Sequence, residues 1–180
     1  LHAGVRWISV FEVRIHGRGG QGVVTAAELL SVAAFAEGRH AQAFPSFGSE
    51  RTGAPVVSFV RVADSQIRVR EPVVEPDALV IQDPTLLHQV DVFSGVHEHG
   101  FVLINAARPI EELGIDEVLE RIHPARALAI PATEIAREHL GRPLPNVAML
   151  GGLAALTGIV GIDAVASAIR ERFASTLAEM

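Results

Sequence analysis

Phe11-Glu-Val-Arg-Ile-His-Gly-Arg-Gly-Gly-Gln-Gly22 is the stretch that decides how this chain begins to fold. Residues 11–15 alternate apolar and polar side chains, which is the period of a half-buried strand, and glycines follow directly. Beyond Gly22 the apolar positions recur with helical spacing as far as about Glu37, where Gly38 supplies a stop. The predicted order is therefore strand, glycine turn and helix.

The glycine turn satisfies the pattern G-x-G-x-x-G between a strand and a helix. Glycines let the backbone approach a phosphate, and the start of a helix offers N–H groups that favour an anion. An NAD or FAD site also needs an acidic residue about 20 residues further on, but the predicted second strand, His40–Phe44, does not end in one. Two interpretations stay open: a tight packing turn, or a site for a phosphate-bearing ligand or a partner's carboxylate, which Arg18 and Gln21 favour.

The rest of the chain alternates short strands with helices. Pro55–Val62 and Gln66–Arg70 both alternate like strands, and the short link between them predicts an antiparallel pair. Three continuous apolar runs predict strands covered on both faces in a mostly parallel sheet: Ala78–Ile81, Phe101–Ile104 and Ala127–Ile130. Helices are expected over residues 85–90, 115–121, 133–140, 147–162 and 163–177, the last with Asp163 as its N-cap.

We therefore expect one α/β domain over residues 11–180, with a mixed, mostly parallel sheet, helices on its faces and a Rossmann-like opening. Residues 1–10 are interpreted as an N-terminal extension. A chain of 180 residues can bury a core without disulfide support. Because 49% of the residues are hydrophobic, a surface buried against a partner is also favoured.

Composition and charge exclude several kinds of function. The chain has no cysteine, so it cannot supply the thiolates that usually hold an iron–sulfur cluster. A net charge of −6 leaves no basic face for nucleic acid. The first residues lack the apolar run of a secretory signal, and Val147–Ile162 is shorter than a membrane span, so a cytoplasmic protein without a span is expected.

Smaller features allow more than one interpretation. Asp83 follows an apolar run and precedes a proline, so it either lies at the ligand-binding edge of the sheet or caps the next helix. Arg68 and Arg70 share one face of a predicted strand, either as a solvated edge or as a subunit contact. His97-Glu98-His99 is typical of an exposed turn, so no metal site is predicted. No catalytic residue is proposed, because no serine, histidine and carboxylate cluster resembles a hydrolytic triad.

The chain resembles the gamma subunit of the 2-oxoacid:ferredoxin oxidoreductases, most closely that of the pyruvate enzyme, pyruvate synthase. Two long segments carry the resemblance, Arg14–Glu28 with the glycine turn and Ala41–Val56 with a loop rich in Gly, Pro and Ser. Shorter segments follow in the order of the family: Glu75–Asp77, Gln82–Leu87, Ile104-Asn105, Gly141–Pro143 and Asn146–Gly151.

The resemblance implies a complex that oxidises a 2-oxoacid on thiamine diphosphate, releases CO2, passes electrons through 4Fe-4S clusters to ferredoxin and forms an acyl-coenzyme A. Thiamine diphosphate, its magnesium ion and the clusters would sit on partner chains, the alpha, beta and ferredoxin-like delta subunits. This chain alone would hold no cofactor. Its expected role is to contact coenzyme A as a substrate of the complex.

Carried over by position, the residues expected to face coenzyme A are Gly17, Arg18, Gly19, Gly20, Gln21 and Gly22, then Ser49, Glu50 and Arg51, with Asn146 nearby. Three alternatives remain. The chain could serve a branched-chain or aromatic 2-oxoacid enzyme, such as one for phenylglyoxylate with NAD as final acceptor. It could be a purely structural subunit, or an independent NAD- or FAD-binding dehydrogenase domain.

Overall fold

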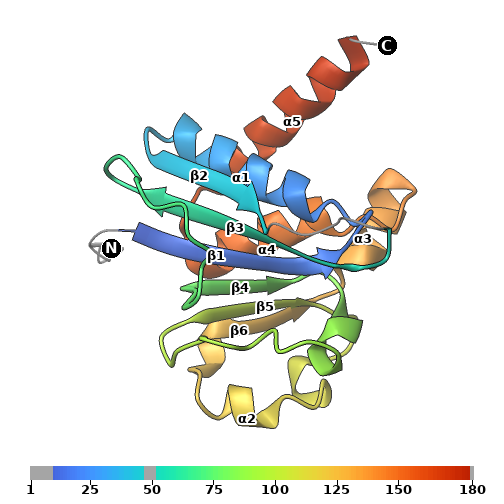
Figure 1. Cartoon of the computed structure of the whole chain (residues 1–180). Helices are drawn as coiled ribbons and strands as arrows, with labels where there is room; N and C mark the ends of the chain where they lie inside the picture. The colour runs from blue at the N-terminus through green and yellow to red at the C-terminus, as the bar shows by residue number, and fades with distance from the viewer. Residues whose placement is uncertain (1–9, 47–51, 179–180) are drawn as a thin grey trace.

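A six-stranded sheet in the order β2-β3-β1-β4-β5-β6 forms the centre of the computed structural model (Figure 1). The model describes residues 10–46 and 52–178, with side chains to Ala174. The strands are β1 (Val10–Arg18), β2 (His40–Pro45), β3 (Pro55–Ala63), β4 (Ala78–Ile81), β5 (Phe101–Asn105) and β6 (Ala127–Ile130). Among these residues no helix is both long enough and apolar enough for a membrane crossing.

The sheet is mixed and mostly parallel, as the sequence predicts. β1, β4, β5 and β6 pair in parallel, while β3 runs antiparallel to both β1 and β2. Parallel strands joined by crossovers end at the same edge, so the residues after β1, β4 and β5 come together there. This carboxyl edge is where ligands of open α/β sheets bind.

Long helices cover one face of the sheet. They are α1 (Val23–Ala36), α4 (Asn146–Thr157) and α5 (Ile162–Ala178), which pack against one another, with α3 (Ala132–Leu140) packed on α4. Their core contains side chains with no exposed surface, among them Leu30, Val60 and Leu153. Each fully buried leucine of this kind contributes about 2 kcal/mol of hydrophobic stabilisation. In Figure 1 the far half of α5 extends away from the body of the protein.

Short elements cover the other face: η1 (Pro84–His88), η2 (Ile110–Glu112), α2 (Asp116–Leu119) and η3 (Pro124–Arg126). A separate apolar cluster lies beneath them, and Leu79, Ile81 and Leu86 belong to it. The predicted helices over 85–90 and 115–121 are therefore present in shorter form. Together the two faces confirm an α/β domain with helices on both sides of its sheet.

Four predictions of local structure need correction. The helix expected over 147–162 ends at Thr157, where Gly158 adopts a left-handed conformation with φ 66°, and α5 begins separately at Ile162. Residues 66–70 are coil, because both edges of β3 already bond β1 and β2 and leave no edge for a further strand. Arg68 and Arg70 therefore do not share a strand face, and Arg70 instead lines a small hollow beside Gln42 and Phe44 of β2. Asp163 lies in the first turn of α5 and is not its N-cap, since the helix begins at Ile162. β1 also continues past residue 15 through Gly17 to Arg18.

Arg14 fastens the coil on the second face to the sheet. This side chain is 7% exposed, and its Nη1 donates to the carbonyls of Val73 and Val74 at 3.3 and 3.2 Å. Its Nη2 donates to the carbonyl of Val92 at 2.9 Å and to that of Ser94. One buried guanidinium thus ties two coil segments to the central strand, since each coil carbonyl gains a charged donor.

Candidate ligand site at the glycine turn

Gly17 and Gly22 are needed for packing at the turn. A Cβ at Gly17 would overlap the Val23 side chain, and a Cβ at Gly22 would overlap that of Asn146. Gly22 is also left-handed, with φ 70° and ψ 33°, a conformation that costs other residues about 1 kcal/mol. The packing interpretation of the turn therefore holds for these two glycines. Gly20 differs, since a Cβ there meets nothing within 4 Å among the described residues.

The start of α1 offers backbone donors. The first hydrogen bond of the helix runs from the N–H of Ala26 to the carbonyl of Gly22 at 2.9 Å, and no described side chain caps this end. The N–H groups of Val23, Val24 and Thr25 consequently have no partner among the residues that the structure describes. Together with the helix dipole they favour an anion at this end.

These donors border a cavity of about 430 Å³. Its walls come from the glycine turn, the first turn of α1, β3, the segment before α4, and α5. The lining residues are Arg18, Gly19, Gly20, Gly22, Val23, Val24, Thr25, Val56, Leu144, Asn146, Arg172 and Phe173. The volume lies within the range of small-molecule sites.

Asp83 holds the turn from the side of β4. Its Oδ2 accepts from Gln21 Nε2 at 2.7 Å and lies 3.3 Å from Arg18 Nε. Its Oδ1 accepts from the N–H and the hydroxyl of Thr85 at 2.9 and 2.6 Å, so Asp83 caps η1 as well. Both interpretations of its position are thus correct in geometry: it lies at the carboxyl edge and it caps the next helix.

The charge on Asp83 follows from these contacts. Burial alone would raise the pKa of the carboxyl, but hydrogen bonds from Thr85 and Gln21, together with the Arg18 guanidinium, bring that pKa below its ordinary value. Asp83 is therefore ionised at neutral pH and keeps both Gln21 and Arg18 in place. Gln21 in turn accepts the N–H of Arg18 through Oε1 at 2.8 Å, which closes the turn on itself.

Arg18 is bound mainly by the chain itself. Its Nη1 donates to the carbonyl of Gly53 at 3.0 Å, and its Nη2 donates to Thr85 Oγ1 and Gln89 Oε1 at 2.7 and 2.5 Å. The prediction that Arg18 projects from the turn toward a ligand therefore needs refinement. Its guanidinium ties the turn to η1 and to the segment after residue 51, and the free donors of the site are backbone N–H groups.

A row of amide side chains continues the edge beyond the turn. Gln82 Nε2 donates to the carbonyl of Gln21 at 2.8 Å, and Asn105 Nδ2 donates both to the carbonyl of Gln82 and to Thr133 Oγ1 at 2.8 Å. Gln82 and Asn105 are buried. The ends of β1, β4 and β5 are thereby joined through side chains, so the turn rests on a fixed base.

Two charged or titratable side chains lie behind the turn on the second face. Burial, and secondarily the Arg14 guanidinium, lowers the pKa of His16 to about 4. His16 is therefore neutral at physiological pH. No group of three or more His, Asp or Glu side chains in the described part of the chain could hold a metal ion.

The predicted site residues fall into two groups. The turn from Gly17 to Gly22 and Asn146 come together, with Asn146 Nδ2 3.3 Å from the carbonyl of Gly22. Ser49, Glu50 and Arg51 lie outside the described residues, so their predicted role stays a prediction. Sequence reasoning noticed Asp83 without placing it in the site, although its position after an apolar run was a usable signal. It missed Arg172 and Phe173, for which the sequence offers no signal.

Strand, glycine turn and helix, with unpaired N–H groups beside an open cavity, define a Rossmann-like α/β domain with the geometry of an anion site. The family model described as Pyruvate ferredoxin/flavodoxin oxidoreductase matches residues 12–180, and the chain belongs to this family. The chain is 48% identical over 170 residues to the pyruvate/ketoisovalerate oxidoreductases common subunit gamma of Thermococcus litoralis. That match covers 93% of this chain and 89% of the relative. The predicted resemblance to a gamma subunit is thereby confirmed.

Solved structures agree with the fold. The crystal structure of pyruvate oxidoreductase subunit PORC from Thermotoga maritima is 35% identical, with a TM-score of 0.77, over 92% of this chain and 86% of that one. The 2-oxoglutarate:ferredoxin oxidoreductase of Magnetococcus marinus, 18% identical with a TM-score of 0.74, shares the fold over 94% of this chain and 28% of its own. The chain thus has the fold of a pyruvate oxidoreductase subunit.

Proposed function

We propose that this chain is the gamma subunit of a thiamine diphosphate-dependent complex that converts a 2-oxoacid to an acyl-coenzyme A and CO2. In this proposal electrons pass to ferredoxin, and the alpha, beta and delta subunits carry thiamine diphosphate, its magnesium ion and the 4Fe-4S clusters. Support comes from the family and from the absence of cysteine in the sequence. The role assigned to this chain is to receive coenzyme A at the glycine turn and to help assemble the complex.

The observation that carries the coenzyme A role is the set of unpaired N–H groups on Val23, Val24 and Thr25 beside the 430 Å³ cavity. These groups would donate to phosphate oxygens of coenzyme A, while Asp83 and Gln21 hold the turn in position. A cavity of this size can take the diphosphate but not the whole molecule, so the remainder would lie against a partner subunit. The 2-oxoglutarate enzyme of similar fold was solved with coenzyme A and succinyl-CoA bound.

Pyruvate is the 2-oxoacid that we propose, with branched-chain or aromatic 2-oxoacids as the alternative. The relative from Thermococcus litoralis is named as a common subunit of pyruvate and ketoisovalerate oxidoreductases. A shared gamma subunit implies that substrate choice lies on other chains. The identity of the partner subunits would therefore decide the 2-oxoacid and the final electron acceptor.

Thr25→Asp in the assembled complex tests the coenzyme A role. Thr25 lines the cavity at the first turn of α1, where a carboxylate stabilises the helix but repels a phosphate. We expect the KM for coenzyme A to rise roughly tenfold, equivalent to about 1.4 kcal/mol, with little change in kcat. Ser31→Asp, on the same helix away from its start, is the matched control.

Two further measurements separate this role from a purely structural one. The KM for coenzyme A should be measured after Arg18→Ala and Arg51→Ala, since both positions belong to the predicted contact set. Mass spectrometry of the co-purified complex should recover larger subunits bearing thiamine and iron. Suppose that the complex assembles only when this chain is present, but that no variant of the cavity changes the KM for coenzyme A. The role of the chain would then be structural.

A further inference from the structure

The cavity beside the glycine turn has a second wall, supplied by α5. Arg172 and Phe173 line the cavity together with residues of the first turn of α1. Both belong to α5, whose far half extends away from the body of the protein in Figure 1. Phe173 is 49% exposed, so its ring is accessible to a ligand in the cavity.

The charge of the cavity differs from that of the protein. The chain carries 21 acidic and 15 basic residues, yet the described lining of the cavity contains Arg18 and Arg172 and no carboxylate. The Arg18 guanidinium pairs with Asp83 and is bound within the turn, so the free positive potential on that side comes from the start of α1. Arg172 lines the same cavity, so an anion there would meet a guanidinium as well as the free N–H groups of α1.

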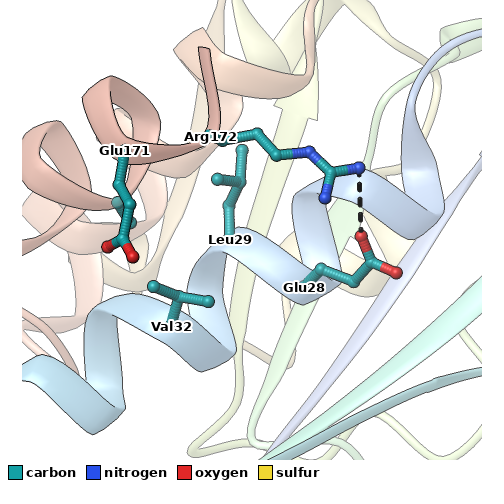
Figure 2. Close-up of a pocket in the computed structure, with 6 residues that line it drawn as sticks. Glu28, Leu29, Val32, Glu171 and Arg172 are labelled. Atoms are coloured by element: carbon teal, nitrogen blue, oxygen red, sulfur yellow. Dashed lines mark ion pairs between the residues drawn. The ribbon is translucent and has the colours of Figure 1, made fainter. Parts of the chain in front are cut away.

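Arg172 makes a long ion pair beside the cavity. Its Nη2 lies 3.7 Å from Glu28 Oε2 on α1, and the two side chains are 55% and 51% exposed. Figure 2 shows the guanidinium extending over Leu29 toward Glu28. Arg172 also lines the neighbouring 240 Å³ cavity with Glu28 and Val32, so it stands between the two cavities. A long, exposed pair of this kind is easily replaced by a stronger anion.

We propose that Arg172 binds an anionic group of the ligand by exchanging Glu28 for it, and that Phe173 packs against the ligand's ring or chain. The inference rests on the proposed coenzyme A role and adds two residues of α5 to that site. Glu28 is then the carboxylate that Arg172 exchanges for the anionic group of the ligand. A guanidinium suits this part because its fork of N–H groups matches phosphate oxygens.

The test uses the assembled complex with coenzyme A as substrate and inorganic pyrophosphate as a competing probe. Arg172→Ala should raise the KM for coenzyme A about tenfold and weaken pyrophosphate inhibition similarly, while kcat stays within about twofold. Arg172→Lys should recover only part of the loss, because an ammonium lacks the fork. Arg170→Ala is the matched control, since Arg170 is exposed on the same helix and does not line the cavity.

Two variants separate the exchange from a general charge effect. Glu28→Gln should lower the KM about twofold, because Arg172 loses its competing carboxylate, whereas Glu171→Gln on α5 should not change it.

Phe173→Ala tests the packing contact. It should raise the KM for coenzyme A about fivefold and leave pyrophosphate inhibition unchanged.

The outcomes distinguish this inference from the proposed function. If Thr25→Asp raises the KM for coenzyme A and Arg172→Ala changes neither the KM nor pyrophosphate inhibition, the α5 contact is wrong and the coenzyme A role stands. If neither variant changes the KM, the coenzyme A role itself fails, and this inference fails with it. The α5 contact would also be contradicted if Arg170→Ala raised the KM for coenzyme A as much as Arg172→Ala does. The effect would then come from the overall charge of the helix.

Discussion

The two faces of the sheet are built in different ways. On one face α1, α4 and α5 bury a continuous apolar core with Leu30 and Leu153 fully enclosed. On the other face short helices and coil cover a smaller apolar cluster, and buried Arg14 donates hydrogen bonds to the coil beside this cluster. Arg61, only 3% exposed, donates to Glu12 at 2.6 Å on this second face. Hydrophobic burial stabilises both faces, and on the second face buried arginines add directed hydrogen bonds.

The glycine turn lies at the junction of these two faces, and both of them position it. The glycine turn lies where β1 passes from the sheet into α1, so one side of it packs against the helical face. Its other side is held by Asp83 and η1 from the second face. The helical core supplies rigidity, and the polar contacts supply orientation. A site at this junction can keep its donors fixed without closing the cavity.

Leu30→Ala should have the largest effect on stability. Leu30 has no exposed surface in the helical core, and large-to-small changes at such positions cost about 3 kcal/mol through lost burial and the cavity left behind. Urea denaturation of the purified chain measures the change. Val32→Ala on the same helix, at a side chain 42% exposed, should cost far less. Equal losses at the two positions would contradict a dominant helical core.

Arg14→Met should cost about 2 kcal/mol, because it leaves coil carbonyls without their charged donor. Hydrogen exchange should become faster in residues 73–76 and 92–96, while the helical face keeps its protection. Arg70→Met, at an exposed coil position, serves as the control. Loss of protection spread evenly over both faces would show that the two are not secured separately.

His16 should make stability depend on pH by about 1 kcal/mol between pH 7 and pH 5.5. Its pKa is lowered to about 4 by burial, with the Arg14 guanidinium second, from an ordinary value of 6.5. Between about pH 6.5 and pH 4 the imidazole is therefore protonated in the unfolded state but not in the folded state. The free energy of unfolding thus falls as the pH drops through this range. His16→Gln should remove this part of the pH dependence. An unchanged slope in the variant would place the proton uptake elsewhere.

Asp64→Asn should have the smallest effect, about 0.5 kcal/mol or less. Asp64 pairs with Arg39 at 3.2 Å, but its side chain is 74% exposed, and pairs of this kind contribute little. Thermal unfolding at low and high salt measures the difference. A loss as large as that of Arg14→Met would mean that an exposed charge pair contributes as much to stability as the buried hydrogen bonds of Arg14.

The fold was largely predictable because its signals are local. The alternation of residues 11–15, the glycines and the helical period after them determine β1, the turn and α1, and the apolar runs at 78–81, 101–104 and 127–130 determine the parallel strands. The pairing of β3 was not predictable, since alternation shows a strand but not its neighbours. Residues 66–70 carry the same alternation as β3, and only the occupied edges of β3 exclude them from the sheet.

The site was predictable in part. The turn and Asn146 were identified from motif and resemblance, and Gly22 lies against Asn146 as expected. The orientation of Arg18 was not predictable, because Thr85 and Gln89, which bind it, are more than 60 residues away in sequence. Arg172 and Phe173 reach the cavity only through the packing of α5 on α1, which no local pattern records.

A structure of the assembled complex with coenzyme A bound would test the role of the glycine turn directly. We predict a phosphate of coenzyme A within hydrogen-bonding distance of the N–H groups of Val24 and Thr25, in the cavity beside the glycine turn. Coenzyme A bound elsewhere, with this cavity filled by a partner subunit, would contradict it.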